Sequence, residues 1–422
     1  MRDFGVLLSL AALASLALWR PWLGVIGLAF VGYLQPHTYA GDFARHLPIY
    51  KILFAATVIG TLFTRDRQLP PRDWRVLVLV GLWLLFFLTT TFSWLPFLAW
   101  PRFVEVSAVL ASTFLVLVLI NTREKLFVLI AAIALAFGLV SLKGGFWAVI
   151  HGFADRVYGP PNSQYGDNNH FAVAAVMTIP LLLLWFRQSA APWLKAALAL
   201  AIVLSVFAAL SSWSRGALLA LGVTSMLLLI DSRKGAWALV PVVAAVVLAL
   251  VLLPEQWFAR MQTIGAHQVE GSAQGRLDVW RQGVGYALRS PFLGAGFEGW
   301  VVGKEGPDWH SAYVEMMAEQ GFLAFTLWVS LILGTLVGLT HLAWSHRGNA
   351  ESAWVRHYSS ALRASLVAYC VGGAFIGIGY WDLLYQLIAA AIVLEALSDR
   401  LVSPTLRPVS GWDQPVAPAA EL

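Results

Sequence analysis

The sequence has few charged residues. Only 12% of its 422 residues are Asp, Glu, Lys or Arg, whereas a soluble domain has roughly 25%. Hydrophobic residues make up 59% of the chain, and its mean hydropathy is +0.72. The lone cysteine, Cys370, lies inside an apolar run and excludes a disulfide framework. Strand-like alternation in segments of about 10 residues, typical of a membrane β-barrel, is also missing. The composition therefore predicts an all-α integral membrane protein.

Sequence motifs for metals and nucleotides are missing as well. The chain has no HExxH, Asp-x-Asp or paired-cysteine pattern and no Walker loop, and its nine histidines are scattered. "GAGFEG", residues 294–299, formally matches GxGxxG, but no βαβ pattern surrounds it, so we interpret it as a glycine turn. We therefore expect no metal, no cofactor and no nucleic-acid partner.

Apolar runs of about the ~20 residues that cross a bilayer recur along the chain. They predict about twelve membrane-spanning helices, or thirteen if the first two short runs both cross. The runs lie near residues 4–18, 21–35, 49–64, 76–97, 103–120, 126–143, 170–186, 196–212, 216–231, 236–253, 321–344, 361–380 and 383–397.

Basic residues gather in alternate connections. "TRDRQLPPRDWR", "NTREK", "DSRKG" and "SHRGNAESAWVRHYSSALR" all fall on one side if the spans alternate, and the positive-inside rule makes that side cytoplasmic. Residues 36–48, 144–169 and 254–309 then lie outside.

The last of these outer segments is too long for a simple connection, so we expect a folded cap. We expect its apolar side chains to lie against the outer leaflet: Trp257, Phe258, Trp280, Phe292, Phe297 and Trp300. The predicted regions are a membrane bundle at 1–253, a large outer loop at 254–310, further spans at 311–400 and a disordered cytoplasmic tail at 401–422.

Arginines on the outer side need an explanation, because a charge inside a membrane costs about 2.5–3.5 kcal/mol. Arg215 follows Ser214 in "LSSWSRGALLAL", where two apolar runs meet almost without a loop. It either snorkels to headgroups or binds a phosphate, which guanidinium matches with two hydrogen bonds. Arg276, Arg281 and Arg289 lie on one helical run, where Arg276 and Trp280 share a face. An amphipathic helix on anionic headgroups has the same pattern.

His310 begins the run "DWHSAYVEMMAEQGF". We expect Asp308 or Ser311 to cap a helix with His310 in its first turn, where the helix dipole disfavours the imidazolium. A neutral ring there is a competent general base, although capping or interfacial packing is the favoured interpretation of a histidine that stands alone.

Further polar residues surround these positions. Glu315 and Glu319 share one face of the same predicted helix, and Tyr313 lies beside them. Arg156 and "VYGPPNSQYGDNNHF" either line a substrate entrance or form loop turns, and we interpret His170 as a helix-start residue.

These groups suit the departure of a diphosphate. Charge that builds on a leaving diphosphate is stabilised by Mg²⁺ or by fixed guanidinium groups. Because no acidic metal pair is visible, the arginines are the candidates. A base that activates a hydroxyl opposite the leaving group implies one displacement with inversion at the anomeric carbon.

The motifs "SWSRGALLA", "GRLDVWRQG" with "SPFLGAGFEGW", and "DWHSAYVEMMAEQGFLAF" occur in this order. In these motifs the chain resembles the O-antigen ligase and polymerase superfamily. The resemblance implies a metal-independent, inverting glycosyltransferase of the membrane-embedded C class. It implies that a glycan leaves undecaprenyl diphosphate at the periplasmic face of a Gram-negative inner membrane. Arg215 and Arg276 would bind the diphosphate and His310 would act as general base, with Arg281, Arg289, Arg156, Ser214, Trp280, Tyr313 and Glu315 as possible supporting residues.

The acceptor stays open. "MRDFGVLL", "LQPHTYAGDFA" and "VYGPPNSQYGDNNHF" are similar to O-glycosylation ligases that accompany exosortase systems. Lipid A core sugar is the first expectation, a protein serine or threonine the second, and another repeat unit, as in polymerases, the third. A transporter or flippase for a lipid-linked anion is the alternative from another class, and it predicts charges near the bilayer midplane.

Overall fold

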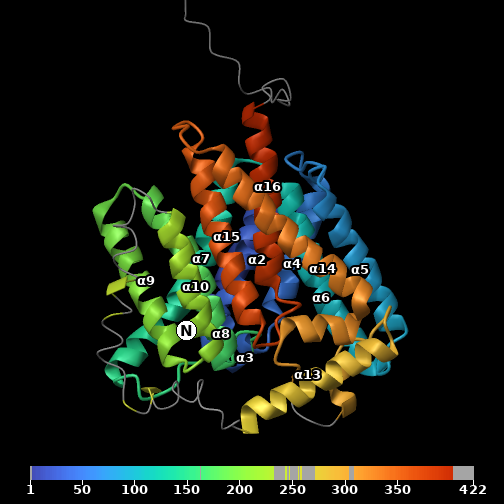
Figure 1. Ribbon diagram of the computed structural model, residues 1–422. Helices are drawn as coiled ribbons and strands as arrows, with labels where there is room; N and C mark the ends of the chain where they lie inside the picture. Colours follow the sequence, from blue (N-terminus) through green and yellow to red (C-terminus); the bar gives the residue numbers. More distant parts are fainter. Residues whose placement is uncertain are drawn as a thin grey trace, which may run out of the picture.

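The computed structural model describes residues 2–161, 163–231, 271–303 and 308–402, together with Val243, Ala244, Val247, Glu255, Trp257 and Phe258. Within this described part the chain is helical and contains no strand (Figure 1). Its longer helices are α1 (Arg2–Trp19), α2 (Pro21–Leu34), α4 (Ile49–Phe63), α5 (Trp74–Thr91), α6 (Pro96–Leu119), α7 (Arg123–Ile150), α8 (Asn168–Gln188), α9 (Pro192–Ser211), α10 (Arg215–Asp231), α13 (Gly271–Arg289), α14 (Ala312–Ser345), α15 (Ala353–Gly373) and α16 (Asp382–Val402). Short helical segments are η1 (Pro36–Tyr39), α3 (Asp42–Arg45) and η3 (Gly299–Gly303).

Six of the helices among the described residues are long and apolar enough to cross a membrane: α5, α6, α7, α8, α9 and α14. Shorter apolar helices cover Asp3–Trp19, Pro21–Leu34 and Ile49–Phe63. The prediction of a multi-pass, all-helical membrane protein is confirmed. The count of twelve spans stays a prediction. The predicted run 236–253 and the tail after Val402 lie outside the described residues, apart from three isolated positions in the run.

Short polar residues and prolines set the starts of the helices. The carboxylate of Asp73 accepts a hydrogen bond from the backbone N–H of Arg75 at 2.8 Å, and that of Asp167 accepts one from Asn169 at 2.8 Å. Each bond satisfies an N–H group that the first turn of a helix leaves without a partner. Other helices begin with a proline, which needs no N–H partner there: Pro21, Pro96 and Pro192.

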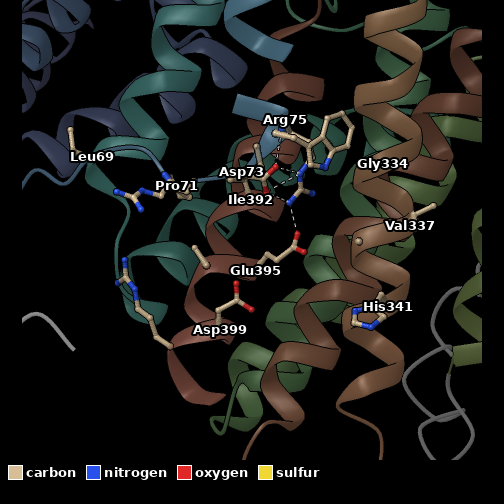
Figure 2. A pocket seen from close by; sticks show the side chains of 15 residues that line it. Leu69, Pro71, Asp73, Arg75, Gly334, Val337, His341, Ile392, Glu395 and Asp399 are labelled. Atoms are coloured by element: carbon tan, nitrogen blue, oxygen red, sulfur yellow. Dashed lines mark hydrogen bonds and ion pairs between the residues drawn. The ribbon is translucent and has the colours of Figure 1, made fainter. Parts of the chain in front are cut away.

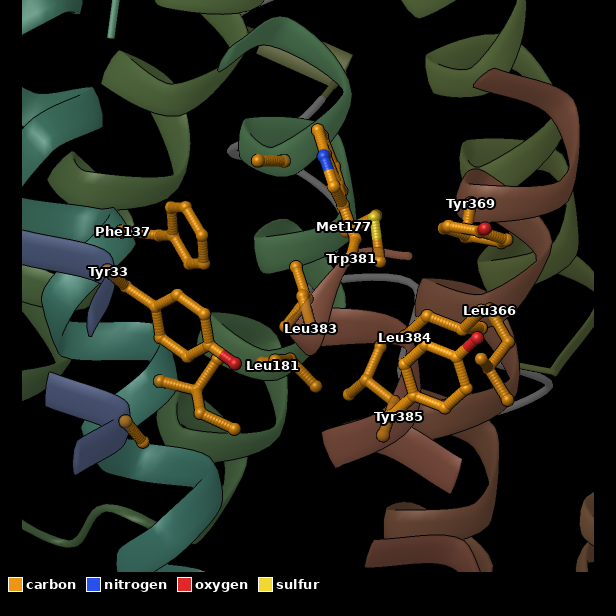
Figure 3. Close-up of a cluster of buried hydrophobic side chains, with 14 of the residues drawn as sticks. Tyr33, Phe137, Met177, Leu181, Leu366, Tyr369, Trp381, Leu383, Leu384 and Tyr385 are labelled. Atoms are coloured by element: carbon orange, nitrogen blue, oxygen red, sulfur yellow. The ribbon is translucent and has the colours of Figure 1, made fainter. Parts of the chain in front are cut away.

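The core surrounds α16, whose side chains from Leu383 to Leu394 are almost all buried. Figure 3 shows where its aromatic and aliphatic side chains meet those of α2, α7, α8 and α15. The ring of Tyr33 stacks on Phe137 with centroids 4.7 Å apart, and Phe137 meets Tyr165 edge-on at 4.9 Å. The last helix is therefore the centre of the bundle, and it anchors the connection that precedes it, residues 374–381.

Basic connections meet at one end of the bundle, as the charge pattern predicts. Lys125 binds Asp66 at 2.7 Å, and Arg400 donates to Gln68 at 3.0 Å. Figure 2 shows the same end, where Arg75 is buried between Asp73 and Glu395 beside a cavity of about 720 Å³. Helix α13 lies at the opposite end (Figure 1).

Two of the apolar side chains that we expected at the outer leaflet are in the core instead. Trp257 is 4% exposed and donates to the carbonyl of Leu210 at 3.1 Å. Phe297 is fully buried against Phe86 and Tyr380. The prediction was wrong for these two because aromatic residues suit a packed core as well as an interface. Phe292 is 73% exposed, as that prediction requires.

Candidate functional site

Arg215 stands where α9 and α10 almost touch. Only Ser212–Ser214 separate the two helices, and Trp213 makes the sharp turn with φ of 60°. The hydroxyl of Ser214 accepts from the backbone N–H of Ala217 at 3.3 Å and so caps α10. Arg215 is therefore the first residue of α10 and is half-buried, at the junction of two helices where the sequence places it.

Arg276 on α13 lies close to Arg215. The pKa of Arg276 is lowered, mainly by burial and then by the positive charge of Arg215. The two guanidinium groups come from helices about 60 residues apart in the sequence. Because two like charges repel, their proximity favours any anion that comes between them. The pair can therefore bind a phosphate or a diphosphate.

His310 precedes helix α14 and is not in its first turn. It has the left-handed φ of 53° and is followed by Ser311, which occupies the cap position without a side-chain capping bond. The expectation of a first-turn histidine was therefore wrong, and the helix dipole is not the main influence on its ring.

Burial disfavours the imidazolium form of His310, the effect that we had assigned to the helix dipole. It lowers the pKa of His310 below its usual 6.5, against the negative charge of Asp308. The positive charge of Arg276 lowers this pKa further, and so does His170. The ring is therefore neutral at neutral pH and able to accept a proton. The same interactions place Arg276 and His170 near His310.

Aromatic side chains hold the segment before His310. Trp309 is 1% exposed, and its indole donates to the carboxylate of Glu319 at 2.9 Å. Trp280, one turn from Arg276 on α13, donates to the carbonyl of Trp309 at 3.0 Å. Because Trp309 contacts both α13 and α14, the position of His310 is tied to that of Arg276.

A break in α14 fixes the next loop. Gly321 has φ of 76°, so the helix kinks and its preceding carbonyls lose their usual helical partners. The carbonyls of Ala318 and Glu319 instead accept from the backbone N–H groups of Ala295 at 2.9 Å and Gly296 at 2.8 Å. The interpretation of residues 294–299 as a glycine turn is confirmed.

The buried carboxylates of α14 face the connection between α15 and α16. Glu315 accepts from the backbone N–H of Gly379 at 2.7 Å, and Glu319 accepts from the hydroxyl of Tyr380 at 2.9 Å. The Tyr380 oxygen also accepts from the Gln320 amide at 2.9 Å. Our prediction that Glu315 and Glu319 share a helix face is confirmed, and both side chains are buried.

A cavity of about 200 Å³ opens beside Glu315. Its lining includes Arg102 from α6, His170 from α8, and Tyr380 and Trp381 from the connection before α16. His170 lies in the first turn of α8, as expected, with its ring nitrogens near Asp167 at 3.2 Å and the Gly377 carbonyl at 3.4 Å.

Sequence reasoning missed Arg102, Tyr380 and Trp381. The signals were an arginine inside the apolar run "FLAWPRFVEV" and the glycine and aromatic residues of "GIGYW". Both fall at the outer ends of predicted spans.

Several of the possible supporting residues have other partners or lie in other places. Arg281 is exposed and pairs with Asp278 at 3.0 Å, and Arg289 is exposed at the end of α13. Arg156 lies over the ring of Trp213 at 5.9 Å and lines a separate hollow of about 740 Å³. Tyr313 donates to the carbonyl of Cys370 at 3.0 Å. Arg276 interacts electrostatically with both Arg215 and His310, and the roles of these three residues stay predictions.

Metal-ligating side chains do not gather at this site. Over the residues that the structure describes, no group of three or more His, Cys, Asp and Glu side chains is placed to hold a metal ion. Metal independence stays a prediction.

Two family models match the chain. Residues 200–329 match the model described as O-antigen ligase, and residues 1–191 match a family of unknown function (DUF5935). No curated protein matches it. The first match contains all three of Arg215, Arg276 and His310.

Proposed function

We propose that the chain, whose residues 200–329 match the O-antigen ligase model, is a glycosyltransferase of that superfamily and that it transfers a glycan from undecaprenyl diphosphate to lipid A core oligosaccharide. We place the reaction at the periplasmic face of the inner membrane, because the candidate site lies at the end of the bundle opposite the basic connections. The observation that carries the proposal is that Arg276 interacts with both Arg215 and His310, which come from separate segments, while Trp280 on the same helix is hydrogen-bonded to the residue before His310.

In the proposed reaction Arg215 and Arg276 bind the diphosphate. An anion between two cations relieves their mutual repulsion. The attraction of the cations for the leaving group then grows as that group takes on negative charge. A hydrogen bond between charged groups contributes about 1.5–3 kcal/mol. Two such bonds that strengthen in the transition state supply a useful part of the barrier reduction.

His310 would take the proton from the acceptor hydroxyl. The hydroxyl oxygen attacks the anomeric carbon as its proton passes to the imidazole, and the bond from that carbon to the diphosphate oxygen breaks. The diphosphate leaves with the electron pair. One displacement of this kind inverts the anomeric centre. The lowered pKa of His310 keeps the ring unprotonated and ready for this step.

The test uses purified protein in lipid nanodiscs with a lipid-linked glycan donor and lipid A core acceptor. We expect transfer without nucleotide and in the presence of EDTA, and we expect His310→Ala to abolish the product while the protein still elutes as a folded species. Loss of transfer on chelation would restore a role for a metal. Turnover retained by His310→Ala would remove this histidine from the reaction.

Parallel assays with three different acceptors identify the acceptor. A protein O-oligosaccharyltransferase would use a serine- or threonine-containing polypeptide, and a polymerase would use a second lipid-linked repeat unit. The same donor offered with each of the three acceptors separates these alternatives from the ligase. A lipid-linked anion transporter would instead move the donor across the membrane of a sealed vesicle without forming the glycosylated product.

A further inference from the structure

Neither Arg215 nor Arg276 lines the cavity beside Glu315, but polar and aromatic side chains do. Its volume of about 200 Å³ is below the roughly 300–1,000 Å³ of pockets that take drug-sized molecules. It therefore has room for a small unit such as one sugar ring. Gln164, His170, Arg102 and Glu315 supply donors and acceptors to its lining, and Tyr380 and Trp381 supply aromatic surface.

Glu315 has an oxygen ready for a ligand. The carboxylate is 9% exposed, and its Oε2 atom accepts from Gly379. Among the described residues no hydrogen bond is made to its other oxygen, Oε1, and this oxygen is not fully enclosed by protein atoms. Arg102 lines the same cavity, and its side chain also pairs with Glu105 at 2.8 Å. A hydroxyl of a ligand in the cavity would therefore be able to donate a hydrogen bond to Oε1.

Glycine allows the wall of this cavity to approach the segment of His310. A β-carbon at Gly377 would lie 2.4 Å from a carboxylate oxygen of Asp308, and one at Gly379 would lie 3.1 Å from the Glu315 carboxylate. Both distances are too short for an alanine without movement. The cavity and the candidate base are therefore neighbours through Asp308, two residues before His310.

We propose that this cavity is a subsite for one sugar ring of the acceptor, in which Glu315 accepts hydrogen bonds from ring hydroxyls and Trp381 and Tyr380 contact its C–H surface. A sugar ring matches the lining because it has hydroxyl groups around its edge and apolar C–H groups on its faces. The side chain of a peptide serine would leave most of the cavity unfilled. The assignment of the ring to the acceptor rests on the proposed transferase function, since the acceptor hydroxyl must reach the base.

The test measures initial rates against acceptor concentration and against donor concentration, with the full chain in nanodiscs. Glu315→Gln keeps the size of the side chain but replaces one acceptor oxygen by a donor, and we expect acceptor KM to rise about 10-fold or more. Donor KM should stay unchanged. Gln164→Ala, at an exposed loop position, should raise acceptor KM about 2- to 10-fold without risk to folding. Glu124→Gln, exposed at the other end of the bundle, is the matched control and should change neither constant.

A second measurement separates this proposal from the transferase function. Delipidated core oligosaccharide is titrated onto the protein without donor, and binding should weaken by the same factor in Glu315→Gln. Weakened binding in a protein without transfer activity would refute the function and retain the subsite. An unchanged acceptor KM in both variants would refute the subsite. A rise in donor KM alone would also refute it, because the ring would then belong to the donor.

Discussion

Replacement of Arg276 by glutamine should change both the rate and its pH dependence. Arg276 lies beside Arg215, where we propose that it binds the diphosphate, and its charge lowers the pKa of His310. The loss of one charge-assisted hydrogen bond costs about 1.5–3 kcal/mol, so kcat/KM should fall about 10- to 150-fold. The pKa of His310 should rise at the same time, because one of the positive charges that lower it is gone.

The sign of the pH effect follows from the role of a base. A general base works only when it is neutral, so the rate falls as pH falls through its pKa. Burial and Arg276 lower the pKa of His310, and the acidic limb of the wild-type profile should therefore lie below pH 6.5. A nearby charge across partly hydrated protein contributes roughly 0.5–1.5 kcal/mol, which moves the limb of Arg276→Gln upward by roughly 0.4–1 pH unit.

Two further variants separate charge from geometry. Arg276→Lys keeps the positive charge but loses the planar pair of donors, so its limb should stay in place while kcat/KM falls. Arg281→Gln removes a charge from the same helix at an exposed position that pairs with Asp278, and it should leave both the limb and the rate unchanged. The assay is kcat/KM for the donor between pH 4.5 and 8. The placement of Arg276 beside the base would be refuted if the acidic limb of the Arg276→Gln pH profile coincided with that of Arg281→Gln or moved to lower pH.

Other predictions concern stability. Arg75→Met removes the cation that pairs with both Asp73 and Glu395. Thermal unfolding in detergent should show a loss of stability near the lower end of about 3–5 kcal/mol, because Glu395 keeps contact with water. An unchanged melting temperature would contradict the buried cluster of Figure 2. Gly294→Ala should also destabilise the protein, by about 1–2 kcal/mol from its φ of 63° alone. A steric clash adds to this cost, because the new β-carbon would lie 2.4 Å from the backbone of α14. Gly275→Ala, with open space around its β-carbon, should be neutral or stabilising, and an equal loss in both glycine variants would disprove the steric argument.

The helices and the outer arginines were predictable because their signals are local. An apolar run of membrane length or a charge between two such runs needs no knowledge of the neighbouring helices. Arg215 and His310 were found in this way. The burial of Trp257 and Phe297 was not predictable, because aromatic residues suit both a protein core and a membrane interface.

The small cavity was unpredictable for a different reason. Arg102, Glu315 and Trp381 lie on segments far apart in the sequence, and only packing around α16 brings them together. The conformation of His310 was missed because the sequence permits a helix to begin either before or after it. Its positive φ depends on the contacts of Trp309 with α13 and with Glu319.

The most direct test of the account is an experimental structure of the protein with a non-cleavable analogue of the diphosphate-linked donor. We predict diphosphate oxygens within about 4 Å of the guanidinium groups of both Arg215 and Arg276, with the His310 ring facing the anomeric carbon from the opposite side. A diphosphate bound away from either arginine, or on the same side of that carbon as His310, would contradict the proposed mechanism.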